Sequence, residues 1–163
     1  TMGRFRYEPS VGSDLYRRSI YTFWRRSVGP TGMFDASKRR SCEVRSVRTN
    51  TPLQALNLMN DEMFVEAART LADSALTAAS SSTDQLQWIA LRILQRELTM
   101  SEIDILLEQL ADTRQEYEGD RESASALVAV GQTEAATDDA VSAAALTMVA
   151  ATILNADEAI THE

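Results

Sequence analysis

Cysteine, histidine and lysine each occur only once in this sequence of 163 residues. The single cysteine, Cys42, excludes an internal disulfide, and no cysteine or histidine spacing suits a zinc ion or a c-type haem. Catalysis by a Cys42 thiolate would need a base, but the only histidine, His162, stands in the C-terminal tail. We therefore interpret Cys42 as a buried structural thiol, with a thiol activated by Arg39, Arg40 and Arg45 as the alternative. We expect no cofactor.

Glycine and proline are also scarce, at 6 and 3 residues, which argues against a turn-rich β-sandwich. The abundant Ala, Leu, Glu, Gln and Arg favour helices. There is no glycine pattern of a dinucleotide site or a P-loop. The longest apolar run, residues 143–154, is too short and too polar to span a bilayer, and residues 1–4 lack the apolar stretch of a signal peptide. We predict a single all-α domain over residues 1–163.

Charge of one sign is scarce in each part of the chain. Residues 1–50 hold 11 Lys and Arg against 4 Asp and Glu, a net charge of +7, whereas residues 51–163 hold 5 against 20, a net charge of −15. One interpretation is an anion-binding surface in the basic part. The other is that the two oppositely charged parts dock and neutralise each other.

The basic part divides into three segments. Residues 1–12 are an irregular lead-in, and residues 13–27 are a predicted helix. Residues 28–51 are a long irregular Arg-rich connection, which Gly29 and Pro30 separate from that helix. A connection of this length without regular structure is often functional. One face of the predicted helix is apolar and the residues around it are basic: Leu15, Ile20, Phe23 and Trp24, with Arg17, Arg18, Arg25 and Arg26.

A helical bundle is predicted over residues 52–155, and the first of its helices has the clearest start signal. Thr51 is the expected N-cap, with Pro52 at the first helical position and Gln54 reaching back. The helix is expected to run to about residue 79, with a kink where Asn60 recaps it. Its expected core face repeats at helical spacing: Leu53, Leu56, Met59, Met63, Ala67 and Leu71.

The remaining helices are predicted from apolar period and capping residues. They are expected over residues 83–95, from Ser101 as N-cap to about residue 117, over residues 121–130 closed by Gly131, and from Thr137 as N-cap to residue 155. The last of these is apolar on every side, which places it in the middle of the bundle. Short connections favour antiparallel neighbours, so we expect a bundle of about five to six helices. Residues 156–163 are predicted to be a polar tail.

Several dense motifs stand in order along the chain. They are LYRRSIYTFWRR (15–26), MFD (33–35), CEVR (42–45), RTNTPLQAL (48–56), ND (60–61), FVEAA (64–68) and, near the end, ATILN (151–155) with Glu158. Together they resemble the C-terminal domain-of-unknown-function family 1553, the PSD domain of large planctomycete proteins.

This resemblance implies the kind of protein to which the chain belongs, but no reaction. Members are usually long exported proteins, often with an N-terminal cytochrome-c-like domain, so the chain would be a C-terminal part and its first partner the N-terminal remainder of the same polypeptide. The family has no established activity, and we assign no catalytic residue from it. The family is frequent in organisms that degrade sulfated polysaccharides, which makes an anionic polysaccharide the ligand that the resemblance suggests.

The candidate anion- or ligand-binding residues are basic, aromatic or amide side chains of the front segments, with two residues of the first bundle helix. Each has a structural alternative: packing in the core, pairing with the acidic body, or capping a helix. The acidic net charge argues against nucleic acid. The candidates are Arg17, Arg18, Trp24, Arg25, Arg40, Arg45, Arg48, Asn50, Asn60 and Asp61.

Three functions follow from these patterns. The first is a non-catalytic helical module of a large exported protein that contacts anionic polysaccharide. The second is part of a composite active site, completed by an N-terminal region, in which Asn50, Asp61 and Glu66 contribute. The third is a protein–protein docking domain, which should carry a large exposed apolar patch.

Overall fold

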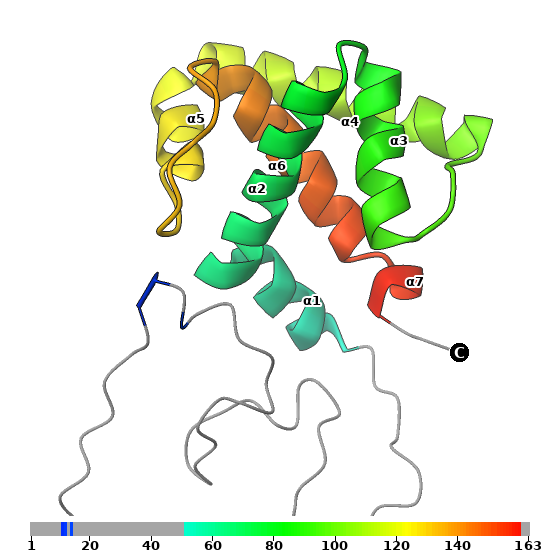
Figure 1. Cartoon of the computed structure of the whole chain (residues 1–163), viewed down its shortest axis with the longest axis horizontal. Coiled ribbons are helices and arrows are strands. Elements are labelled where there is room, and N and C mark those ends of the chain that lie inside the picture. The colour runs from blue at the N-terminus through cyan, green and yellow to red at the C-terminus, as the bar shows by residue number, and fades with distance from the viewer. Residues whose placement is uncertain (1–10, 13, 15–50, 161–163) are drawn as a thin grey trace, which may run out of the picture.

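The computed structural model describes residues 11, 12, 14 and 51–160. These residues form an all-α body, which confirms the predicted fold class (Figure 1). The helix expected over residues 13–27 and the Arg-rich connection lie almost wholly outside the described residues, and the single-domain extent stays a prediction. The helices are α1 (Pro52–Asn60), α2 (Glu62–Ala78), α3 (Ser82–Ile93), α4 (Met100–Gly119), α5 (Arg121–Val128), α6 (Ala140–Leu154) and α7 (Asp157–Ile160).

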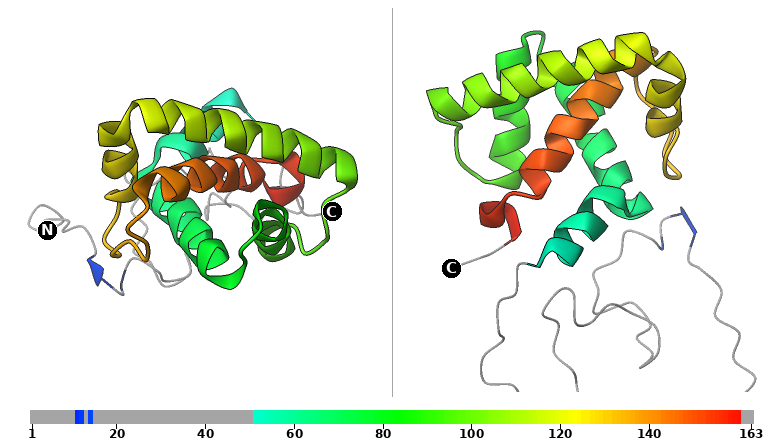
Figure 2. Two further views of the ribbon diagram at one scale, coloured as in Figure 1. Left: turned by 90° about the horizontal axis from the view of Figure 1, so that it is seen from above. Right: turned by 180° about the vertical axis from the view of Figure 1, so that it is seen from behind.

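Helix α6 is the centre of the body, as its all-round apolar character predicted. It contacts every other helix, most extensively α2, α4 and α5, and Figure 2 shows it running beneath α4 and beside α2. Its first turns are rich in alanine, and Ala143, Ala144 and Ala145 are completely buried. Side chains this small let neighbouring helix backbones approach closely, while Leu146, Val149 and Ile153 fill the wider spaces of the core.

Several helix starts differ from the predicted ones by one or two residues. Thr51 caps α1 as expected, accepting a hydrogen bond from the Gln54 backbone. Helix α4 is capped by Thr99 in a full capping box with Glu102, so the prediction of Ser101 was wrong. Asp139 rather than Thr137 caps α6. In the last two cases two good capping residues stand close together, so the sequence alone does not distinguish them.

The expected long first helix is two helices. Asp61 ends α1 and caps α2 by accepting a hydrogen bond from the Met63 backbone, so the recapping residue is Asp61, not Asn60. The expected core face was also wrong, because Leu53, Leu56, Met59 and Met63 are exposed. The buried face of α2 carries Ala68, Ala72 and Ala75 together with Glu66, Arg69 and Asp73. Small side chains fit this face because α2 packs on α6.

The predicted polar tail contains a short helix instead. Helix α7 packs on α6, and Glu158 on α7 pairs with Arg96, which follows α3. Helix α3 ends at Ile93, two residues before the expected end, and the chain turns at Gln95 with a φ of 57°. Helix α5 ends at Val128, also two residues early, so Gly131 belongs to the loop before α6 rather than to the helix cap.

Candidate functional site

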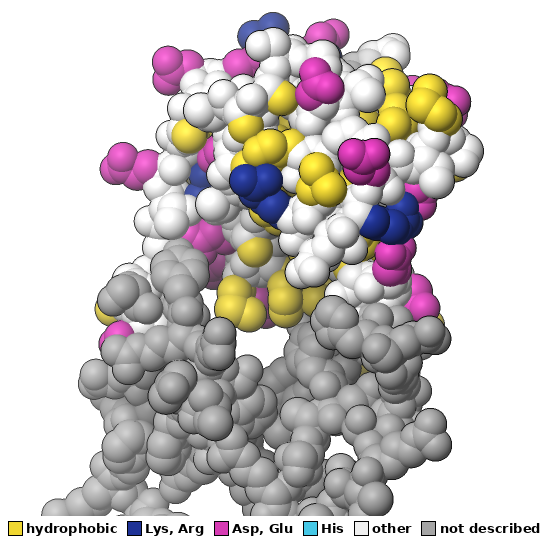
Figure 3. Space-filling view, turned by 45° about the vertical axis from the view of Figure 1, so that its right-hand side comes forward, with side chains coloured by type: hydrophobic (Ala, Val, Ile, Leu, Met, Phe, Trp, Pro, Cys, Tyr) yellow, Lys and Arg dark blue, Asp and Glu magenta, His cyan; other side chains and the backbone are white. Residues whose placement is uncertain are grey.

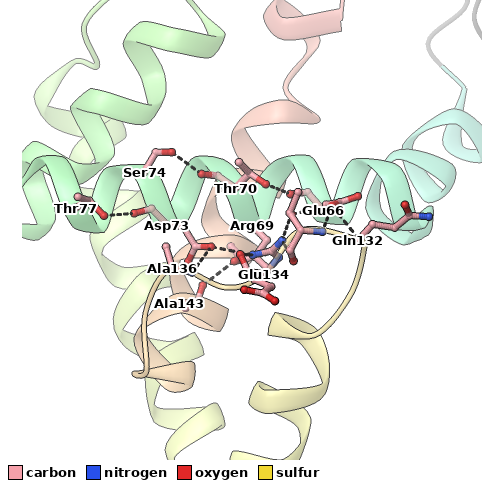
Figure 4. Close-up of polar contacts among 12 residues, drawn as sticks. Glu66, Arg69, Thr70, Asp73, Ser74, Thr77, Gln132, Glu134, Ala136 and Ala143 are labelled. Atoms are coloured by element: carbon pink, nitrogen blue, oxygen red, sulfur yellow. Dashed lines mark hydrogen bonds and ion pairs between the residues drawn. The ribbon is translucent and has the colours of Figure 1, made fainter. Parts of the chain in front are cut away.

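Three charged side chains line the inward face of α2. Glu66, Arg69 and Asp73 are 5%, 1% and 5% exposed, and their spacing of three and four residues places them on one side of the helix. Buried charges are costly unless they are paired and hydrogen-bonded. This cluster, which we call the α2 clamp, is therefore the most site-like feature in the described part of the chain (Figure 4).

Glu66 binds the loop of residues 131–136, which joins α5 to α6. One carboxylate oxygen, Oε1, accepts hydrogen bonds from the backbone amides of Gln132 at 2.9 Å and Thr133 at 2.8 Å, and from the Thr133 hydroxyl at 2.8 Å. Gly131 lies directly against the Glu66 side chain with a φ of 96°. A glycine is needed here because that backbone conformation disfavours side chains and the space is already filled.

Arg69 and Asp73 complete the clamp. The Arg69 guanidinium donates to Asp73 Oδ2 at 2.9 Å, to the Thr133 carbonyl at 2.8 Å and to the Thr133 hydroxyl. Asp73 Oδ2 also accepts from the Ala136 amide at 3.3 Å. The clamp atoms without a hydrogen-bond partner are Arg69 Nε and Asp73 Oδ1. These contacts use the charges to fix a loop of the chain itself, which is a structural role.

Helix α1 and the start of α2 carry exposed apolar side chains. Leu53, Leu56, Met59 and Met63 are 60%, 59%, 43% and 51% exposed, and they make up half of the large exposed hydrophobic residues in the described ranges. We call this set the apolar face. Figure 3 shows hydrophobic side chains on the surface at the lower end of the body, where α1 lies in Figure 1.

A groove of about 590 Å³ adjoins the apolar face. One wall is formed by Met59 of the apolar face with Val65 of α2, and the other by the end of α5 and the residues after it, Leu127 and Val130. Met148 of α6 also lines it. Flexible thioethers and branched aliphatic side chains suit such a groove to apolar or aromatic side chains of varied shape.

Two of the predicted ligand-binding residues lie at the junction of α1 and α2. The Asn60 amide donates to the Leu56 carbonyl at 2.8 Å, and Asp61 caps α2. Both are exposed, and both have local structural contacts. The other candidates fall outside the described residues and remain predictions: Arg17, Arg18, Trp24, Arg25, Arg40, Arg45, Arg48 and Asn50.

The surface of the body is strongly acidic, because most of its five arginines are engaged. Arg69 is buried in the clamp, Arg96 lies between Glu102 and Glu158, and the Arg92 guanidinium stacks 3.3 Å from the Trp88 ring centre. Against them residues 51–163 carry 20 acidic residues. A polyanion is therefore repelled by this part of the chain, and any attraction must come from residues 1–50.

Arg96 ties α7 to the start of α4 through two carboxylates. Its guanidinium donates to Glu158 at 2.8 Å from Nε and to Glu102 at 3.0 Å from Nη1. Hydrogen bonding to Arg96, helped by the Thr99 amide, lowers the pKa of Glu102 to about 2. Hydrogen bonding to Arg96 also lowers the pKa of Glu158. Both carboxylates are therefore held in the charged form.

This arrangement predicts acid-dependent release of α7. A carboxylate whose pKa is lower in the folded state stabilises the fold above its ordinary pKa, here 4.5, and loses that effect as the pH falls through the folded value of about 2. The amide hydrogen exchange of residues 157–160 can be measured by NMR and compared with the intrinsic exchange rate at each pH. Relative to that intrinsic rate, the exchange should become faster as the pH falls from about 4.5 to about 2. In Arg96→Met the exchange should already be fast at neutral pH. Equal exchange in both proteins would contradict the assigned role.

Neither a metal cluster nor a spanning helix is found in the parts of the chain that the structure covers. No group of three or more His, Cys, Asp or Glu side chains there is arranged to hold a metal ion. Likewise, none of the helices α1–α7 is long and apolar enough to cross a membrane.

Comparison with known proteins gives one match. Residues 3–110 match the PSD1 family model, described as a protein of unknown function (DUF1553). No curated protein and no solved structure matches the chain. The matched range begins in the basic N-terminal part of the sequence, includes the apolar face and the α2 clamp, and ends within α4. It covers well over half of the residues. The chain therefore belongs to the PSD1 (DUF1553) family.

Proposed function

We propose that this chain is a non-catalytic assembly module of a larger exported protein, and that its helical body holds the polypeptide segment that precedes α1. The observation that carries the proposal is the apolar face of α1 and α2. Export and the larger protein are suggested by the family resemblance. The partner that the proposal requires is the segment of residues 1–50, and the family resemblance suggests the N-terminal remainder of the larger polypeptide as a further partner.

The spacing of the apolar face supports this role. Leu53, Leu56, Met59 and Met63 follow one another at three or four residues, the pattern of a helix side that is buried against another element. Three of the four lie on α1, and Met63 stands at the start of α2, just after the break at Asp61. An apolar stripe of this kind on a surface marks a site of contact with another polypeptide.

The chemistry of the charged groups supports a non-catalytic module. Glu66 accepts three hydrogen bonds from the loop of residues 131–136, and Asp61 is used as a helix cap. Asn60 is bonded to the carbonyl of the preceding turn. Asp61 and Glu66 were the candidate residues of the composite active site within the body. Because both make structural contacts, neither supports the composite active site.

Photo-crosslinking tests the proposed function. With p-benzoylphenylalanine at position 56 of the full chain, we expect irradiation to link α1 to residues of the segment 1–50 within the same molecule, identified by mass spectrometry of the digested monomer. Position 105 is the matched control, because Ile105 is 65% exposed but lies on α4, away from the apolar face. It should give no such link.

Two results would count against the proposal. The first is a crosslink yield at position 56 no higher than at position 105. The second is a covalent dimer as the main product, because the apolar face would then join two copies of the chain instead of holding its preceding segment.

A second candidate function is contact with an anionic polysaccharide. Its support is the distribution of basic residues, 11 of 16 in residues 1–50, while most arginines of the body are engaged in internal contacts. Arginine binds sulfate and carboxylate through paired hydrogen bonds. On this view the body presents the basic segment, and Arg45 and Arg48 are the first residues to test.

Heparin, a sulfated polysaccharide, is a suitable probe for this second function. Arg45→Ala combined with Arg48→Ala should weaken heparin binding by at least about 100-fold at low salt, because two charge-assisted hydrogen bonds contribute about 1.5–3 kcal/mol each. Binding should also weaken steeply as salt is added. The control is Arg121→Ala, since Arg121 is an exposed arginine on α5. Binding that is the same in both variants would exclude the Arg45 and Arg48 site.

A further inference from the structure

We infer that the segment held by the apolar face is the basic and aromatic stretch of residues 15–26, with its apolar side chains in the groove beside Met59. This inference rests on the proposed function and names its occupant. Its support comes from where the chain enters the body, from the chemistry of the groove and from charge.

The chain is tied to the body beside the groove just before this stretch begins. The Gly12 amide donates to the Gln132 side chain at 2.8 Å. Gln132 directly follows Val130 and Gly131, which line the groove. Three residues reach at most about 11 Å, so Leu15 lies within that distance of Gly12. A segment that begins at Leu15 is therefore within reach of one wall of the groove.

The chain returns to the body at the start of α1, whose last residues line the groove. Thr51 caps α1, the helix that carries Met59 and most of the apolar face. A helix over residues 15–26 would be about 18 Å long, and residues 27–50 are ample to bring the chain back to Thr51. Both ends of the segment are thus fixed at the end of the body where the apolar face lies.

The side chains of the stretch match the groove and its rim. The expected apolar side of residues 15–26 includes Phe23 and Trp24, and aromatic rings make favourable contacts with thioethers such as those of Met59 and Met148. The exposed Glu62 lines the groove, and the exposed Asp61 precedes it at the junction of α1 and α2.

The opposite net charges of residues 13–50 and of the body also favour contact between them. Residues 13–50 carry 9 Lys and Arg against 3 Asp and Glu, a net charge of +6, and face a body of net charge −15. The PSD1 family model also spans the segment and the apolar face as one continuous match, residues 3–110. An amphipathic helix that lays its apolar side into a groove is a common mode of peptide recognition.

Tryptophan fluorescence of the full chain tests this occupant. Trp88→Phe leaves Trp24 as the only tryptophan. We expect Trp24 to emit at short wavelength and to resist acrylamide quenching. Adding Met59→Asp should shift the emission to the red and remove the protection, because a carboxylate would be buried in the apolar contact. Ile105→Asp, on exposed α4, is the control and should change neither.

The same comparison can be made without changing Trp88. Chain labelled with 5-fluorotryptophan gives one fluorine resonance for each tryptophan, and only the Trp24 resonance should move on Met59→Asp. A solvent-exposed Trp24 in the folded chain would overturn the inference. If position 56 then still crosslinks to another part of residues 1–50, the proposed function stands with a different occupant. A covalent dimer from position 56 would overturn both.

Discussion

Arg69→Met should lower the free energy of unfolding by about 3–5 kcal/mol, the cost of removing one partner from a buried ion pair. The side chain is 1% exposed and pairs with Asp73 at 2.9 Å. Its loss removes the cation that pairs with the buried Asp73 carboxylate and deprives the Thr133 carbonyl of its donor. The loop of residues 131–136 should then detach from α2. Urea denaturation followed by circular dichroism measures the change.

The control for Arg69→Met is Arg121→Met, which removes an exposed arginine from α5 and should change stability by less than about 0.5 kcal/mol. A double-mutant cycle adds specificity. Arg69→Met with Asp73→Leu should cost less than the two single changes together, because the double variant leaves one fewer unpaired charge in the interior. Additive costs would mean that the two side chains act independently and that the clamp is not a unit.

Gly131→Ala should lower the free energy of unfolding by about 3 kcal/mol. The positive φ of Gly131 costs an alanine about 1–2 kcal/mol. The new Cβ would also stand 2.4 Å from Glu66 Cδ and 2.8 Å from Glu66 Cβ, so the glutamate must move. Moving it weakens charge-assisted hydrogen bonds worth about 1.5–3 kcal/mol each. The measurement is urea unfolding, with amide exchange at Gln132 and Thr133 as the local readout.

Gly119→Ala is the matched control for the glycine change. Gly119 is the last residue of α4, and an added Cβ there meets no atom within 4 Å. Alanine should stabilise this position by up to about 1 kcal/mol, because it restricts the unfolded chain. Opposite signs at the two glycines are therefore expected. Similar effects at both would show that Glu66 does not fill the space beside Gly131.

The sequence was sufficient to predict most helices of the described body and the central one among them, but it missed the division into α1 and α2 and the short helix α7. The apolar character of α6 on every side has only one stable place in a bundle, the middle. Helix starts were less certain because Thr99 and Ser101, or Thr137 and Asp139, are all good caps. Local preference alone cannot choose between such neighbours.

The face of α2 was predicted wrongly for a physical reason. The stripe of leucine and methionine has the stronger apolar signal, but the side against α6 needs small residues such as Ala68 and Ala72. The buried charges of Glu66 and Arg69 are compensated by a loop more than 60 residues away in the sequence. No local pattern reveals that partner. The only available signal was the spacing of alanines and charges on one helix side.

The candidate site was therefore only partly predictable. Asn60 and Asp61 stood out as a motif, and their contacts explain it as the junction between two helices. The apolar face could be recognised as a stripe, although its exposure could not. The proposed function accounts for both its sequence pattern and its exposed position by another segment that completes the contact, and this is the central claim of the proposal.

Methionine oxidation of the full chain measures that claim most directly. On the described body Met59 and Met63 are 43% and 51% exposed, and Met100, at the start of α4, is 74% exposed and serves as the internal reference. With hydrogen peroxide and mass spectrometry, we predict that Met59 and Met63 oxidise several-fold more slowly than Met100, and that Leu56→Asp removes this protection. Oxidation of all three at similar rates in the unmodified chain would contradict the proposal that a polypeptide segment covers the apolar face.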